Sequence, residues 1–211
     1  MKGLIFALAL AISAGCASVP DVANEYSGAD AGRVAIGIGT AKGTYYNVYS
    51  LFFRKVGEKK SDRFAYFHEN MFTAQKRDYE NALESGVVQS FRLSPGDYEI
   101  FNFSIFLNGG TVQNTYGSKQ EFSIPFTVKS NETTYLGNYQ ANKVMGKNFF
   151  GLPLPAGAVF IVSNREKDDL ELVKKRITNV AFGAVINATP VVATIRNPFF
   201  VDSSDKLESA K

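Results

Sequence analysis

The chain has 211 residues and a nearly balanced charge, with 23 Lys and Arg residues against 20 Asp and Glu residues, one histidine and one cysteine. Its basic residues are interspersed with acidic ones and form no basic stripe along the sequence, so we expect no nucleic-acid partner. A single histidine and a single cysteine exclude multi-histidine metal sites, intrachain disulfides and cysteine-rich metal sites, and we expect neither a metal nor another cofactor.

The first predicted element is an export signal. Residues 4–15 are apolar, but they are too few for a transmembrane helix, which needs about 20 residues. Three small residues precede Cys16, an arrangement that resembles the bacterial lipobox except that Ser13 stands where Leu, Val or Ile is usual. We therefore expect residues 1–15 to be a lipoprotein signal peptide and Cys16 to carry acyl chains such as palmitate. The alternative is an ordinary secretory signal cut near Ala17, which would discard the cysteine.

The residues after Cys16 indicate a membrane-tethered domain. Ala17 follows the cysteine, whereas Asp at that position resembles an inner-membrane retention signal in enterobacteria, so we expect a lipid anchor in a bacterial outer membrane. Residues 16–32 are rich in Ala, Ser, Gly and Asp and predict a flexible lipidated tether with a reach of about 20 to 24 Å. We expect a single domain over residues 33–202 and a polar tail over 203–211. Whether the domain faces the periplasm or the cell surface stays open.

Apolar residues in this domain mostly recur at every second position, which indicates strands with one buried face. About seven to nine such strands, separated by Gly- and Pro-containing turns, favour a mainly β, antiparallel β-sandwich. We expect strands over residues 33–39, 45–56, 63–68, 87–93, 98–107, 122–128, 133–140 and 158–162.

Individual residues refine this pattern. Pro95 and Gly96 suit a type II turn, with Gly96 at positive φ, and predict a hairpin between the strands on either side. A switch of the apolar positions along the next strand predicts a bulge near Ile100. Pro125 cannot donate to a strand ladder and predicts a strand that is at an edge or is interrupted there. The glycines of 37–43 lack the spacing of a phosphate-binding loop and predict a turn between strands.

One amphipathic helix is expected near the C-terminus, over about residues 164–177. Ser163 and Glu166 form a candidate capping box at its start. Three apolar residues share one face at helical spacing: Leu170, Val173 and Ile177. We interpret the helix as a cover for the sandwich; the alternative is that its basic face contacts a membrane.

Three segments carry a resemblance to known proteins. They are Phe91-Arg92-Leu93-Ser94-Pro95-Gly96-Asp97-Tyr98, then Tyr135-Leu136-Gly137-Asn138-Tyr139, and then Asp168-Asp169-Leu170. Together they resemble small bacterial envelope lipoproteins with a prealbumin-like or immunoglobulin-like β-sandwich, over about residues 87–177. The resemblance implies a fold and a compartment. Those families are largely of unknown function, so it implies no functional residues.

Catalytic chemistry has little support in the sequence. His68 is the sole imidazole, with Asp62 and Glu69 as its nearest carboxyl groups along the chain. Such a histidine is more often a surface or strand-end residue than an acid–base catalyst. We therefore expect a protein that is not an enzyme, with a hydrolase as a distant alternative.

Four tyrosines are the candidate ligand-binding residues: Tyr45, Tyr49, Tyr135 and Tyr139. Tyrosine combines a flat apolar ring with a polar edge, which suits sugar rings or a protein partner, although aromatic residues are also common in sandwich cores. The leading interpretation is a membrane-tethered, non-enzymatic module that binds an envelope protein or supports assembly. The alternative is a module that binds glycan or peptidoglycan through exposed tyrosines.

Overall fold

The computed structural model describes residues 25–44, 47–67, 76–108, 113–147, 149–151, 153–177 and 182–202. Predictions on the signal peptide, Cys16, Tyr45, His68 and the tail 203–211 lie outside these residues. No helix in the described ranges combines the length and the apolar character needed to cross a membrane.

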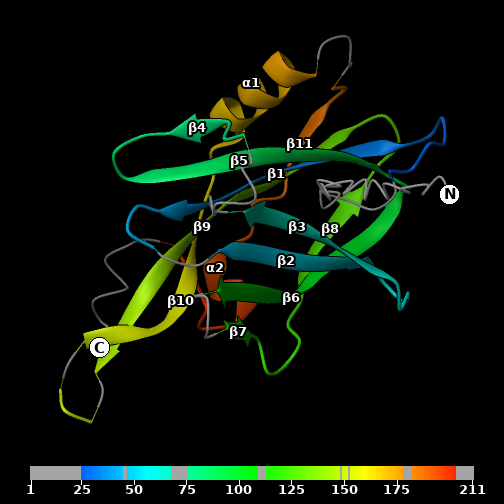
Figure 1. The fold of residues 1–211 in the computed structure, drawn as a ribbon. Coiled ribbons are helices and arrows are strands. Elements are labelled where there is room, and N and C mark those ends of the chain that lie inside the picture. Colours follow the sequence, from blue (N-terminus) through cyan, green and yellow to red (C-terminus); the bar gives the residue numbers. More distant parts are fainter. Residues whose placement is uncertain are drawn as a thin grey trace, which may run out of the picture.

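The described residues form a mainly β sandwich of two sheets, as the sequence pattern predicts (Figure 1). The larger sheet has the order β12-β10-β9-β1-β5-β4, and β11 also pairs with β9. Its strands are β1 (Gly32–Ala41), β4 (Tyr79–Glu80), β5 (Glu84–Leu93), β9 (Thr133–Lys147), β10 (Pro153–Ser163), β11 (Val185–Asn187) and β12 (Phe200–Val201). Three of its pairings, β1 with β9, β11 with β9 and β10 with β12, are parallel. The larger sheet is therefore mixed and not wholly antiparallel.

The smaller sheet has the order β3-β2-β6-β7, and β8 also pairs with β6. Its strands are β2 (Val48–Lys55), β3 (Ser61–Phe67), β6 (Gly96–Asn108), β7 (Gln113–Gly117) and β8 (Ile124–Val128). Pro125 lies opposite Glu99 of β6, and β8 pairs with no other strand in the described part of the chain, so the predicted edge position is confirmed. The predicted bulge is also confirmed, because Phe52 pairs with Asn102 while Phe53 pairs with Ile100.

The core lies between the two sheets and is rich in phenylalanine. Phe160 of β10 is fully buried, with its ring centroid 5.7 Å from the rings of Phe103 and Phe200. The extra residue of the β6 bulge, Phe101, turns away from this core and lies under the Arg54 guanidinium at 4.1 Å. The bulge therefore keeps the apolar positions on both sides of it facing inward.

The predicted hairpin at Pro95 and Gly96 is wrong. Gly96 does have a positive φ of 145°, but β5 pairs with β1 in the larger sheet while β6 pairs with β2 in the smaller one. The turn therefore carries the chain from one sheet to the other, and the Tyr98 hydroxyl holds it by donating to the Ser94 carbonyl oxygen at 2.9 Å. Both strands bury one face in the same core. The apolar alternation is therefore the same whether the turn joins two strands of one sheet or two strands of facing sheets.

The described residues also include two helices, α1 (Glu166–Arg176) and α2 (Val192–Ile195). Helix α1 lies across the larger sheet on the side away from β2 and β6 (Figure 1), and its buried residues are Asp169, Leu170 and Val173. It therefore covers the sandwich, as predicted. The capping box is wrong, because Ser163 is still in β10 and the helix begins after Arg165 without a side-chain cap.

Candidate functional site

Three of the four candidate tyrosines lie in the interior. Tyr49, Tyr135 and Tyr139 each have 0% relative exposure, and Tyr45 lies outside the described residues. The Tyr49 hydroxyl accepts a hydrogen bond from Thr40 Oγ1 at 3.1 Å, and its ring stacks on Tyr66. No sugar ring can reach these three side chains, so the prediction that they form an exposed binding surface is wrong.

Tyr135 and Tyr139 also lie on opposite faces of β9. The register between β1 and β9 shifts from Ala35–Tyr135 to Gly37–Asn138, which marks a bulge, and Gly137 has a φ of 98° that favours glycine. As a result Tyr135 packs beneath α1 and Tyr139 belongs to the core between the sheets. A spacing of four would place both on one face of a regular strand, and the bulge reverses this.

Beneath α1 lies a buried network of polar side chains around Asp169, which is 2% exposed. The Tyr135 hydroxyl donates to Asp169 Oδ2 at 2.6 Å, and Asn138 Nδ2 donates to the same oxygen at 3.0 Å. Gln140 Nε2 donates to Asn138 Oδ1 at 2.6 Å and also to the Tyr79 hydroxyl. Burial raises the pKa of the Asp169 carboxyl, while the hydrogen bonds from Tyr135 and Asn138 and the charge of Arg165 act in the opposite direction.

The absence of a side chain at Gly37 of β1 leaves the space that this network occupies. A Cβ atom at Gly37 would lie 2.1 Å from Asn138 Nδ2 and 2.6 Å from Asp169 Oδ2, so no larger residue fits without displacing them. Gly37 and Gly39 are thus interior residues of a strand, which corrects the predicted turn; of that stretch, Gly43 alone has a positive φ, 74°. The Arg165 guanidinium pairs with both carboxylate oxygens of Glu84 beside the network, at 2.8 Å from Nη2 to Oε2.

The network connects α1 to strand β9. Asp169 is enclosed, and both of its oxygens already accept hydrogen bonds. In the described parts of the chain, no group of three His, Cys, Asp or Glu residues could hold a metal ion. Its polar atoms therefore serve to fix α1 on the sheet.

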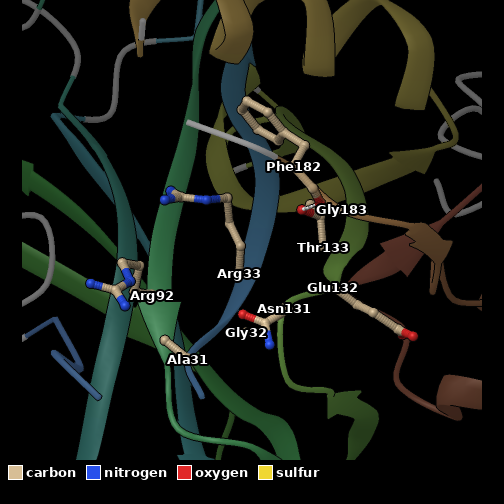
Figure 2. A pocket seen from close by; sticks show the side chains of 9 residues that line it. All are labelled: Ala31, Gly32, Arg33, Arg92, Asn131, Glu132, Thr133, Phe182 and Gly183. Atoms are coloured by element: carbon tan, nitrogen blue, oxygen red, sulfur yellow. Dashed lines mark hydrogen bonds between the residues drawn. The ribbon is translucent and has the colours of Figure 1, made fainter. Parts of the chain in front are cut away.

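An open cavity of about 420 Å³ lies at the end of the larger sheet where β1 begins and β5 ends (Figure 2). Such a volume is within the range of about 300–1,000 Å³ that is typical of ligand sites. The cavity is lined by Ala31, Gly32, Arg33, Arg92, Asn131, Glu132, Thr133, Phe182 and Gly183.

Two arginines give the cavity its charge. Arg33 of β1 and Arg92 of β5 are direct cross-strand partners, a placement at which like charges repel. Arg33 Nη1 donates to Ser90 Oγ at 3.1 Å, and Arg92 Nη2 donates to the Gly28 carbonyl oxygen at 2.9 Å. Neither arginine forms a salt bridge with a residue that the structure describes. Burial lowers the pKa of Arg33, and Arg92 acts in the same direction while Glu25 opposes it.

Phe182 forms an aromatic wall of the cavity. The Arg33 guanidinium and the Lys174 ammonium group each lie 5.7 Å from the centroid of its ring, so a third positive charge lies near the same ring. In Figure 2 the side chain of Glu132 points away from the two arginines. The cavity therefore combines an apolar wall with an excess of positive charge, a combination suited to an anionic group on an apolar body.

The sequence contains only a weak signal for this cavity. Arg92 stands among the apolar residues of its strand, but nothing in the sequence places it opposite Arg33. That placement depends on the antiparallel register of β1 with β5, which joins strands about fifty residues apart.

No protein-family model matches the sequence, and no curated protein matches it. Among solved structures the chain is similar to part of a leucine-rich repeat protein from Bacteroides thetaiotaomicron VPI-5482, with a TM-score of 0.31 and 11% identity. The alignment covers 53% of this chain and 14% of that protein, so the chain spans a small part of its length.

Proposed function

We propose that the chain is a lipoprotein of a bacterial outer membrane, anchored through Cys16, that acts as a non-enzymatic protein-interaction module. Its partner presents an acidic group, a side-chain or C-terminal carboxylate, to the cavity between Arg33 and Arg92. The observation that supports this proposal is the paired arginines of an open cavity, neither in a salt bridge within the described residues.

A carboxylate is the group that such a cavity would bind best. Guanidinium groups form charge-assisted, often bidentate hydrogen bonds with carboxylates, and Arg33 and Arg92 each have N–H groups beyond those used by Ser90 and Gly28. A bound carboxylate would also reduce the repulsion between the two cross-strand charges. The ring of Phe182 would pack against the apolar part of the bound residue.

Other functions have less support. Three of the four tyrosines on which the glycan alternative depended are buried, and the fourth, Tyr45, lies outside the described residues. The most strongly buried carboxyl group, Asp169, is enclosed beneath α1 by its hydrogen bonds, and His68 of the hydrolase alternative lies outside the described residues.

The test is a pull-down from detergent-solubilised envelopes with the intact lipidated protein and an Arg33→Gln/Arg92→Gln variant. The matched control is Lys59→Gln/Lys60→Gln, which removes the same charge from the exposed turn between β2 and β3. We expect the wild type and the control to recover the same envelope protein, and the arginine variant to recover at least about tenfold less, which corresponds to about 1.4 kcal/mol. Equal recovery by the arginine variant, with an unchanged unfolding curve, would contradict the proposed site.

Anchoring is tested separately by metabolic labelling with a palmitate analogue. The wild-type chain should incorporate the label at the processed N-terminus, and Cys16→Ser should not. A labelled Cys16→Ser chain, or an unlabelled wild type, would rule out the lipoprotein assignment without affecting the cavity.

A further inference from the structure

The hairpin of β9 and β10 extends beyond the rest of the larger sheet (Figure 1). The pairing of β1 with β9 ends at Ala141, whereas β9 and β10 continue to pair with each other as far as Lys147 and Pro153. Burial changes at the same place, since residues 133–141 are all buried and residues 142–147 alternate between half-buried and exposed. Among the described residues, the distal part of this hairpin has strand pairing only between β9 and β10.

The tip of the hairpin carries two strongly exposed phenylalanines. Phe149 is 98% exposed and Phe150 is 82% exposed, and their rings meet nearly at right angles with centroids 5.6 Å apart. Each is more exposed than any other large hydrophobic residue that the structure describes. Contiguous exposed apolar surface of this kind marks interaction sites in soluble proteins.

The charged residues of the distal hairpin segment are all basic. Residues 141–156 contain Lys143 and Lys147 and no Asp or Glu. Lys143, Met145 and Lys147 occupy the exposed positions of the alternating segment and therefore share one face of β9. The tip thus combines aromatic side chains with basic ones, the combination typical of protein segments that lie in the interface of an anionic bilayer.

We propose that this hairpin tip inserts into the interfacial region of an anionic lipid bilayer, with Phe149 and Phe150 among the upper acyl chains and Lys143 and Lys147 against the headgroups. The size of the tip favours a bilayer over a protein partner. Two phenylalanines bury roughly 300–500 Å². A stable protein interface needs about 800 Å² on each side.

The contact would set the orientation of the molecule. Thr133 pairs with Arg33 near the start of β1, and Lys147 lies fourteen residues further along β9. At about 3.3 Å per residue, the tip is about 45 Å from the end where the tether enters. Contacts at both ends would hold the long strands roughly parallel to the membrane; this orientation rests on the proposed anchor at Cys16, whereas the bilayer contact itself does not.

The chain contains no tryptophan, so one introduced tryptophan reports on its own surroundings. The test places the Phe150→Trp protein on protein-free vesicles of phosphatidylethanolamine and phosphatidylglycerol. The control is Leu83→Trp, at a residue that is 78% exposed in the turn between β4 and β5. We expect the emission of the Phe150→Trp protein to shift to shorter wavelength and to be quenched by lipids brominated on their acyl chains, with neither change in the control.

Charge provides the second readout. Lys143→Gln/Lys147→Gln in the Phe150→Trp background should reduce the shift, as should added salt or vesicles of phosphatidylcholine alone. Lys59→Gln/Lys60→Gln is the matched control and should leave the shift unchanged.

Two results would overturn the proposal. One is a tryptophan at the tip that stays accessible to water on anionic vesicles. The other is emission and quenching on anionic vesicles that are the same for Phe150→Trp and Leu83→Trp, which would show that the tip has no preference for lipid and would favour a protein partner. Acylation of Cys16 is measured in the separate labelling experiment, so a failure of the lipid anchor is distinguished from a failure of the proposed tip contact.

Discussion

The two faces of the larger sheet are both buried, but they are buried by different chemistry. Along β1, Val34, Ile36 and Ile38 belong to the apolar core between the sheets. The alternate residues Ala35 and Gly37 lie beneath α1, where their neighbours are the ring of Tyr135 and the Asn138 and Asp169 side chains. One strand therefore meets a close-packed aromatic layer on one side and a hydrogen-bonded polar layer on the other.

This difference shows how the position of α1 is specified. An apolar layer tolerates many arrangements of similar volume, whereas a buried carboxyl group must meet its donors at defined distances. Asp169 is the buried polar residue of α1, and its donors Tyr135 and Asn138 both come from β9. The polar layer beneath α1, here called the outer layer, therefore fixes the helix in one place. The apolar core between the sheets, the inner layer, supplies most of the hydrophobic stabilisation.

The largest expected effect comes from the inner layer. Phe160→Ala removes a fully buried ring that contacts Phe103 and Phe200, and should lower the free energy of unfolding by about 3–5 kcal/mol. Phe150→Ala on the exposed tip is the matched control and should change it by less than about 0.5 kcal/mol. Urea unfolding followed by circular dichroism measures both. Similar losses in the two variants would mean that the hairpin tip is buried.

The next largest expected effect on stability compares two tyrosines on opposite faces of β9. Tyr135→Phe removes a donor to the buried Asp169 carboxyl and should cost about 1.5–3 kcal/mol. The Tyr139 hydroxyl is buried without a hydrogen-bond partner among the described residues, so Tyr139→Phe should be neutral or stabilising by up to about 1 kcal/mol. The same urea titrations give both values. The comparison fails if Tyr139→Phe is the more destabilising of the two.

The period-two pattern predicted most of the fold because one-sided burial is a local property of each strand. It located eight strands, the bulge at Phe101 and the edge strand containing Pro125. It missed β4, β7, β11 and β12, which have two to five residues each and depend on pairing with distant strands. It also predicted a hairpin at Gly96, because alternation does not show which sheet a strand joins.

The site was harder to predict because it depends on register. The bulge at Gly137 places Tyr135 and Tyr139 on opposite faces, and no pattern of side chains indicates that bulge. Arg33 and Arg92 meet only through the pairing of β1 with β5. The exposed Phe149 and Phe150 have the same apolar signature as core residues, since sequence does not record how far a hairpin projects beyond its sheet.

The smallest expected effect is a pH dependence confined to the outer layer. Burial raises the folded-state pKa of Asp169 above its ordinary value of 3.8, against the hydrogen bonds from Tyr135 and Asn138 and the charge of Arg165. Between the unfolded and folded pKa values, the folded chain binds more protons than the unfolded chain. The free energy of unfolding therefore falls as the pH rises through that window, and this loss is complete above the folded pKa.

Asp169→Asn removes this titration, so the stability of the wild type relative to the variant should be greatest in acid and should shrink as the pH approaches neutrality. Urea titrations over a pH series measure the difference. Asp168→Asn, at an exposed neighbour in the same helix turn, is the control for the change in charge. A difference for Asp169→Asn that grows with pH would mean that the hydrogen bonds from β9 outweigh burial. The polar layer beneath α1 would then stabilise the ionised form of Asp169 more than its neutral form.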